Sequence, residues 1–238
     1  MQLQPIDFIN GLFSLLVFIT SIIVGFGIMI KYLKNHQKLY LYWGIFFTGM
    51  YCPWWPSALS FLSFLITGEV FNDWTYIFIG NIFIPLLLPF CILSFTELFL
   101  TEKKKSIMII YSIISLFAEI YIIHGLATNY FQLGHLTDTF DIKYEPVMLM
   151  YLFLINFTVT GFGIIFSRYS INSHDPAINK RGWVLLFAFL TYPICGIIDA
   201  GINLNEIGII FVRAILITGV ILFYFGFVIS YKQENKVS

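Results

Sequence analysis

Residues 207–230 read IGIIFVRAILITGVILFYFGFVIS, an apolar run that contains one ionisable side chain, Arg213. A helix needs about 20 mostly apolar residues to cross the hydrocarbon core of a bilayer, and this run supplies them. Further apolar runs occupy residues 8–30, 39–66, 74–100, 107–130, 146–166 and 183–202. None alternates as a barrel strand does, so the pattern predicts an all-α polytopic membrane protein, a seven-helix transmembrane bundle over one domain, residues 1–238.

The composition supports a membrane protein and excludes several other classes. Hydrophobic residues make up 59% of the chain and charged residues 11%, whereas a soluble domain has about 25% charged residues. The 13 Lys and Arg balance the 13 Asp and Glu, which is not the composition of a basic nucleic-acid binder. We therefore expect the lipid bilayer as the surroundings of the chain and no nucleic acid as a partner.

The charged residues between the runs predict the orientation. Eleven basic residues follow the first, third, fifth and seventh runs: Lys31, Lys34, Lys38, Lys103, Lys104, Lys105, Arg168, Lys180, Arg181, Lys232 and Lys236. The opposite side carries Lys143 and most of the acidic residues. The positive-inside rule then predicts a multi-pass protein of the cell membrane with its N-terminus outside and its C-terminus cytoplasmic. No Lys or Arg precedes the first run, which argues against a signal peptide.

Ionisable side chains within the spans are costly and are candidates for function. Asp199 lies near the outer end of the sixth span and Arg213 near the outer end of the seventh, so we expect them at similar depth and paired. The pair is either a structural clasp or a switch that a ligand can open. Glu119, midway along the fourth span, is either a neutral hydrogen-bonding group or a proton or ligand sensor.

Prolines in the second and third spans predict kinks, because proline frees backbone carbonyls and bends a membrane helix. Pro53-Trp54-Trp55-Pro56 lies in the second span, and Asn81 precedes Pro85 in the third. Two kinked neighbouring helices can open a cavity, of which Trp54 and Trp55 would form an aromatic wall. The alternative is bulky packing around a kink.

Two weaker patterns concern the organisation of the chain. The acidic connection at residues 131–145 is either a solvated loop or a lid. The first three spans resemble the last three in matches such as Gly25 with Gly161 and Gly80 with Gly208, which suggests a possible 3+1+3 repeat.

The chain resembles the seven-helix N-terminal sensor region of membrane histidine kinases over about residues 8–232. The resemblance lies in the basic loop 31–38, Gly80, Ile84-Pro85-Leu86-Leu87-Leu88, Arg168, Lys180-Arg181, Pro193 and Phe225-Gly226-Phe227. In that family a cytoplasmic transmitter follows the sensor. Because the chain ends at Ser238, the resemblance implies a stand-alone sensor that signals through a separate cytoplasmic or membrane partner.

These patterns favour a receptor that is not an enzyme. We expect a small apolar or aromatic ligand in the outer half, between spans two, three, four, six and seven, with no cofactor and no metal. The candidate ligand-binding residues are Trp54, Trp55, Asn81, Glu119, Asp199 and Arg213. A retinal protein is excluded, because the last span has no lysine. The alternative is a small-solute transporter of three-plus-one-plus-three helix type, with the prolines as hinges.

Overall fold

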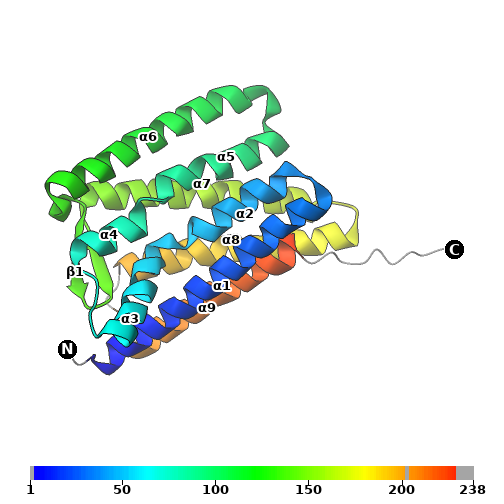
Figure 1. Ribbon diagram of the computed structural model, residues 1–238. Coiled ribbons are helices and arrows are strands. Elements are labelled where there is room, and N and C mark those ends of the chain that lie inside the picture. The colour runs from blue at the N-terminus through cyan, green and yellow to red at the C-terminus, as the bar shows by residue number, and fades with distance from the viewer. Residues whose placement is uncertain (1–2, 202–203, 229–238) are drawn as a thin grey trace.

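A computed structural model describes residues 3–201 and 204–228, which form a bundle of helices lying side by side (Figure 1). The helices are α1 (Pro5–Asn35), α2 (Lys38–Met50), α3 (Trp55–Thr67), α4 (Asp73–Asn81), α5 (Ile84–Phe99), α6 (Lys104–Thr128), α7 (Pro146–Ile171), α8 (Pro176–Gly201) and α9 (Glu206–Phe227). Short 3-10 helices are η1 (Cys52–Trp54), η2 (Thr101–Lys103) and η3 (Tyr130–Gln132), and two strands are β1 (Gly134–Asp138) and β2 (Asp141–Tyr144).

The described helices are those of a multi-pass membrane protein. Six helical segments are long and apolar enough to cross a bilayer: Pro5–Asn35, Asp73–Phe99, Thr101–Thr128, Pro146–Ile171, Pro176–Asp199 and Glu206–Phe227. Helices α2 and α3 have 13 residues each, too few for a crossing, but they follow one another along the bundle and make a further path (Figure 1). The all-α polytopic bundle is therefore confirmed, while the count of seven crossings stays a prediction.

The helices match the predicted spans and extend past them. The first helix continues to Asn35 and the fifth predicted span to Ile171, each five residues beyond the predicted end. This is expected, because hydropathy marks the hydrocarbon core and a helix can continue into the headgroup region. The predicted ends at Ile202 and at residues 229–230, together with Lys232 and Lys236, lie outside the described residues.

The predicted proline breaks are present in both paths. Pro53 cannot donate a backbone hydrogen bond to Gly49, and the chain leaves α2 at Met50, passes through η1 and resumes as α3. Pro85 has the same effect on Asn81, where α4 ends before α5 begins at Ile84. The two breaks lie next to each other, because α4 packs on both α3 and η1.

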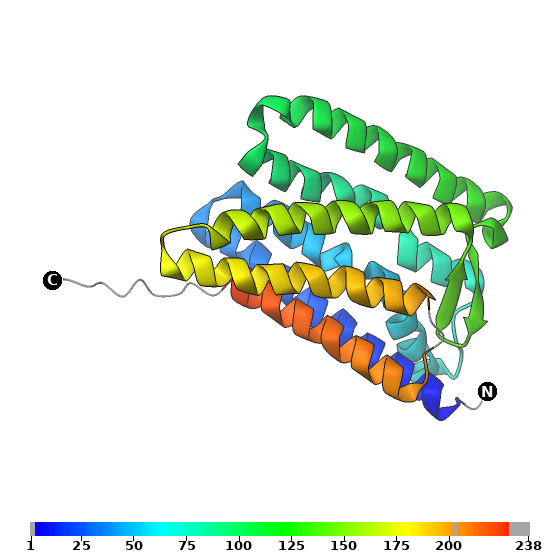
Figure 2. The same ribbon diagram turned by 180° about the vertical axis from the view of Figure 1, so that it is seen from behind.

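Strands β1 and β2 form an antiparallel hairpin that closes one end of the bundle (Figure 2). We call this the hairpin end and the opposite one the far end. The hairpin tip is inserted between the helices, since the Phe140 side chain is 1% exposed and its ring packs edge-on against Phe61 with the centroids 6.0 Å apart. The interpretation of residues 131–145 as a solvated loop is therefore wrong for the tip: the Asn10 amide and the hydrogen-bonded Ser57 and Tyr76 hydroxyls satisfy the Phe140 carbonyl, which makes its burial possible.

Aromatic rings fill the bundle toward the far end. The far-end aromatic cluster consists of Trp43, Phe47, Phe166, Phe189, Phe223 and Phe227. Phe47 and Phe223 lie 4.3 Å apart between ring centroids, and Phe166 stacks on Phe227 at 5.8 Å. These closely packed rings form a dense apolar layer at this level of the bundle.

The packing does not reproduce the proposed repeat residue by residue. A Cβ added to Gly25 would lie 2.8 Å from the Thr48 backbone, so this glycine lets α1 approach α2 closely. Its counterpart Gly161 has nothing within 4 Å, whereas a Cβ on Gly163 would run into Phe189 of α8. The repeat stays a prediction.

Candidate functional site

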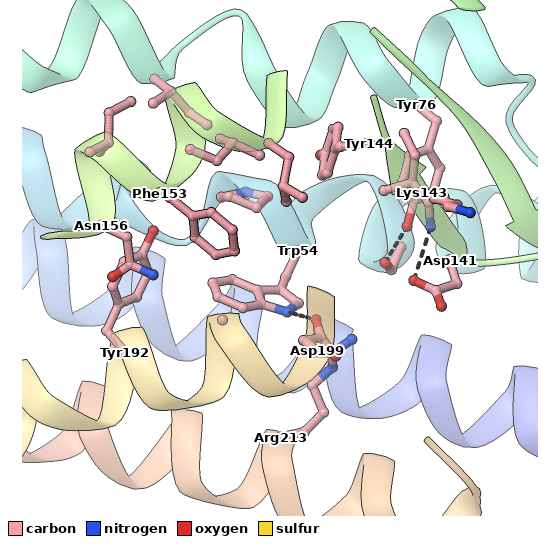
Figure 3. A pocket seen from close by; sticks show the side chains of 18 residues that line it. Trp54, Tyr76, Asp141, Lys143, Tyr144, Phe153, Asn156, Tyr192, Asp199 and Arg213 are labelled. Atoms are coloured by element: carbon pink, nitrogen blue, oxygen red, sulfur yellow. Dashed lines mark hydrogen bonds and ion pairs between the residues drawn. The ribbon is translucent and has the colours of Figure 1, made fainter. Parts of the chain in front are cut away.

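An ion pair between α8 and α9 lies at the centre of the candidate site (Figure 3). Arg213 Nη1 donates to Asp199 Oδ2 at 2.8 Å, and Trp54 Nε1 donates to the same oxygen at 2.7 Å. The Arg213 guanidinium also lies 5.8 Å from the centre of the Trp54 ring, a cation–π distance. The predicted pairing of Asp199 with Arg213 is confirmed, and Trp54 shares it.

Local structure explains why these three groups meet. Asp199 lies in the last turn of α8 and Arg213 in the second turn of α9, so the short connection between the helices places both near the hairpin end. Trp54 is the last residue of η1, and the break caused by Pro53 sets the direction of its indole toward α8.

The ion pair continues into a hydrogen-bond network that reaches the hairpin. Arg213 Nη2 donates to Asn10 Oδ1 at 3.1 Å, and Asn10 Nδ2 donates to the Phe140 carbonyl at 3.2 Å. Ser57 Oγ and Tyr76 Oη lie 3.1 and 2.9 Å from the same carbonyl oxygen and 2.5 Å from each other, so one hydroxyl donates to the carbonyl and the other donates to its neighbour. The network joins α1, η1, α3, α4, α8 and α9 to one backbone oxygen of the hairpin, and we call it the hairpin clamp.

A cavity of about 190 Å³ lies beside the ion pair and beneath the hairpin (Figure 3). Its walls combine aromatic rings, aliphatic side chains and a few charged groups. The lining residues are Pro53, Trp54, Ser57, Tyr76, Ile84, Asp141, Ile142, Lys143, Tyr144, Leu149, Leu152, Phe153, Ile155, Asn156, Tyr192, Gly196, Asp199 and Arg213. A mostly apolar hollow with a few converging polar groups is the usual form of a small-molecule site.

The structure brings three of the six predicted site residues to this cavity, namely Trp54, Asp199 and Arg213. Asn81 lies behind the wall, fully buried, and its amide donates to the Tyr144 hydroxyl at 3.2 Å. Trp55 points elsewhere: its ring packs on Phe18 of α1 and on Phe83, at 5.3 and 6.2 Å between centroids. The expected wall of two tryptophans is therefore wrong, because consecutive helical residues point about 100° apart.

Glu119 and the fourth span do not reach the cavity. Glu119 lies on α6, a peripheral helix that packs mainly against α5, and its Oε2 is enclosed without a hydrogen-bond partner among the described residues. The fifth span takes the expected place of the fourth, because Leu149, Phe153 and Asn156 of α7 line the cavity. The predicted set of surrounding spans is corrected accordingly.

Sequence reasoning missed the contribution of the hairpin and of single polar residues. Asp141 and Tyr144 come from the connection at residues 131–145, whose tight turn, Thr139-Phe140, lacks the Gly or Asn that normally predicts a hairpin. Asn10 and Asn156 are uncharged and were therefore not predicted from the ionisable residues of the spans. Their polarity within apolar runs was the available signal.

Asp141 is the carboxyl group on the hairpin that faces the ion pair. Loss of hydration beside the bundle, followed by the nearby Asp199 carboxylate, raises the pKa of Asp141 to about 6. Hydrogen bonding from the Ile142 amide, at 2.9 Å, and the Arg213 charge oppose this shift. Asp141 thus titrates close to neutrality although its side chain is open to solvent on one side.

Comparison of the chain with protein-family models, with curated proteins and with solved structures found no match. Within residues 3–201 and 204–228, no group of three His, Cys, Asp or Glu side chains is placed to hold a metal ion.

We expect strong energetic coupling between Asp199 and Arg213. Removing one partner of a buried ion pair leaves an uncompensated charge and costs about 3–5 kcal/mol, whereas removing both costs far less. In a double-mutant cycle of Asp199→Asn and Arg213→Met, followed by unfolding in detergent, the coupling should exceed about 1 kcal/mol.

The exposed pair of Glu97 and Lys104, with 3.6 Å between its charged atoms, provides the matched control. A cycle of Glu97→Gln and Lys104→Met should give a coupling below about 1 kcal/mol. Equal couplings for the two pairs would contradict the central role of Asp199 and Arg213.

The Asp141 carboxyl predicts a pH-dependent stability. Its pKa rises on folding from 3.8 to about 6, so the folded state binds the proton more tightly than the unfolded state does. The stability that the bound proton contributes is lost as pH rises through about 6. Asp141→Asn, which keeps the acceptor for the Ile142 amide, should stabilise the protein at pH 7.5. Because the side chain is partly solvated, the gain should be about 1 kcal/mol, or about 2–4 °C in Tm.

The difference between variant and parent should shrink toward pH 4, where both side chains are uncharged. Thr137→Ala, an exposed and uncharged change on β1, should follow the parent at both pH values. A Tm for Asp141→Asn that lies below the parent at pH 7.5 would contradict the assignment.

Proposed function

We propose that this chain is a membrane receptor that binds a small, largely aromatic ligand in the cavity beneath the hairpin and signals through a separate partner. One observation carries the proposal: the wall of the cavity contains the ion pair that also holds the hairpin in place. A ligand beside Asp199 and Arg213 therefore competes with, or completes, contacts on which the hairpin clamp depends.

Helix α9 offers a route from the cavity to the far end. Arg213 lies near its start, and Phe223 and Phe227 near its end belong to the far-end aromatic cluster. Lys31 of α1 donates to the Phe227 carbonyl at 3.0 Å, so α1 and α9 are joined again at that end. A small rotation of α9 caused by a change at Arg213 would alter both contacts.

The orientation proposed for the receptor places the hairpin end outside the cell. The basic residues 31, 34, 38, 103–105, 168, 180 and 181 lie at or near the far ends of the helices, which the positive-inside rule assigns to the cytoplasm. The ligand would then arrive from outside, and the partner would meet the basic face. The proposed relation to histidine-kinase sensor regions would imply the same direction of signalling.

The transporter is the alternative function, favoured by the proline breaks beside the cavity. Transport requires a polar path that opens alternately to the two sides. In the described part of the chain the far-end aromatic cluster fills the level below the cavity, and this arrangement favours a receptor.

Filling the cavity should abolish ligand binding without unfolding the bundle. Gly196 lines the cavity, and a Cβ there would lie 3.3 Å from Asn156 Nδ2, so Gly196→Leu would occupy the hollow. Gly161→Leu adds the same side chain where nothing lies within 4 Å, and it is the matched control. A panel of small aromatic compounds of differing charge would be tested by thermal shift on purified protein.

Compounds that stabilise the parent and Gly161→Leu should not stabilise Gly196→Leu. If Gly196→Leu does not fold, Gly196→Ala should weaken the same compounds to a lesser degree. Equal stabilisation of all variants would contradict the cavity as the binding site. Uptake of a bound compound into sealed vesicles by the parent would replace the receptor with the transporter.

A further inference from the structure

A second hollow lies at the hairpin end and shares three residues with the cavity. It encloses about 310 Å³ and we call it the vestibule. Its lining residues are Gln4, Ile6, Asp7, Asn10, Asp138, Thr139, Asp141, Asp199, Leu204, Ile209 and Arg213. Asp141, Asp199 and Arg213 line both hollows, so vestibule and cavity adjoin at these three residues, which we call the partition.

The vestibule carries an excess of negative charge. Four carboxyl groups line it, from Asp7, Asp138, Asp141 and Asp199, and Arg213 is the one basic residue among its lining residues. The terminal nitrogens of Arg213 are already engaged by Asp199 and Asn10. A hollow lined by one sign of charge and walled by protein raises the local concentration of ions of opposite sign.

The carboxylates of the partition retain free acceptor capacity. Asp199 receives both of its hydrogen bonds at Oδ2, and Asp141 receives the Ile142 amide at Oδ1. Among the described residues no hydrogen bond runs to the second oxygen of either carboxyl group. A ligand with N–H groups can donate hydrogen bonds to these free carboxylate oxygens, whereas an anion would be repelled by their negative charge.

Beyond the partition the walls become aromatic. Trp54, Tyr76, Tyr144, Phe153 and Tyr192 line the cavity, and Figure 3 shows the Trp54 indole reaching toward Asp199. Aromatic faces attract cations as well as flat rings. At about 190 Å³ the cavity is smaller than the roughly 300–1,000 Å³ of sites for drug-sized ligands, which indicates a ligand with a single ring.

We infer that the ligand is a small organic cation, an amine carried on one aromatic ring. Its ammonium group would lie between Asp141 and Asp199, and its ring among Trp54, Phe153 and Tyr192. The cation is organic, because the carboxyl groups of the described residues are not arranged as a metal site. This inference rests on the proposed receptor and names the chemistry of its ligand.

Lys143 provides a second, independent test of the charge of the ligand. It is the other basic residue of the cavity wall and projects from β2 with an exposed side chain. An ammonium ligand would be repelled by it, so Lys143→Gln should strengthen binding of an amine and weaken binding of an anion.

Three probes that share one ring and differ in charge test the inference. They are 2-phenylethylamine, 2-phenylethanol and phenylacetate, measured by calorimetry at pH 7.5 on the full chain in lipid nanodiscs. The amine should bind at least about tenfold more tightly than the alcohol, about 1.4 kcal/mol, and phenylacetate should not bind. Asp141→Asn should weaken the amine by about tenfold and leave the alcohol unchanged.

Glu69→Gln is the matched control, since it removes the same charge from the loop between α3 and α4, away from both hollows. It should leave amine binding unchanged. If the alcohol or phenylacetate binds more tightly than the amine, and Gly196→Leu abolishes that binding, the inference of a cationic ligand is overturned while the proposed receptor is supported. Absence of binding by all three probes would also overturn this inference, whereas the wider compound panel decides the receptor independently.

Discussion

A carboxylate and a guanidinium enclosed between helices of a membrane bundle must remain paired, and much of the hairpin end follows from this constraint. Arg213 is 4% exposed, and an unpaired charge at such a place would cost several kcal/mol. The pair fixes α8 against α9, requires the Trp54 indole as a further donor, and leaves one Arg213 nitrogen for Asn10. Asn10 in turn donates to the Phe140 carbonyl, so the position of the hairpin depends on the charged side chains of α8 and α9, which lie far from it in the sequence.

The spans, both proline breaks and the ion pair were predictable because each has a local cause in the sequence. Apolar length sets a span, proline removes a backbone donor, and a short connection places Asp199 and Arg213 at one depth. The hairpin was not predictable in this way. Its buried tip depends on hydrogen bonds with Asn10, Ser57 and Tyr76, which lie far away in the chain and meet only after the helices have packed.

The candidate site was predictable in part, for reasons that differ between residues. Trp54 and Trp55 have the same chemistry, but only the first points toward α8. Glu119 is a polar group in a span, as Asp199 is, yet α6 lies at the edge of the bundle and carries it away from the cavity. Polarity in a span identifies candidates, and helix packing decides which of them share a site.

The central claim is that the ion pair holds the hairpin over the cavity. Hydrogen–deuterium exchange of the amides in residues 134–144 tests it most directly, by comparing the parent with Arg213→Met in nanodiscs. Exchange should be much faster across the hairpin in the variant and unchanged in α6, which does not line the cavity or the vestibule beside Arg213. Unchanged protection of residues 134–144 in a folded Arg213→Met protein would contradict the account.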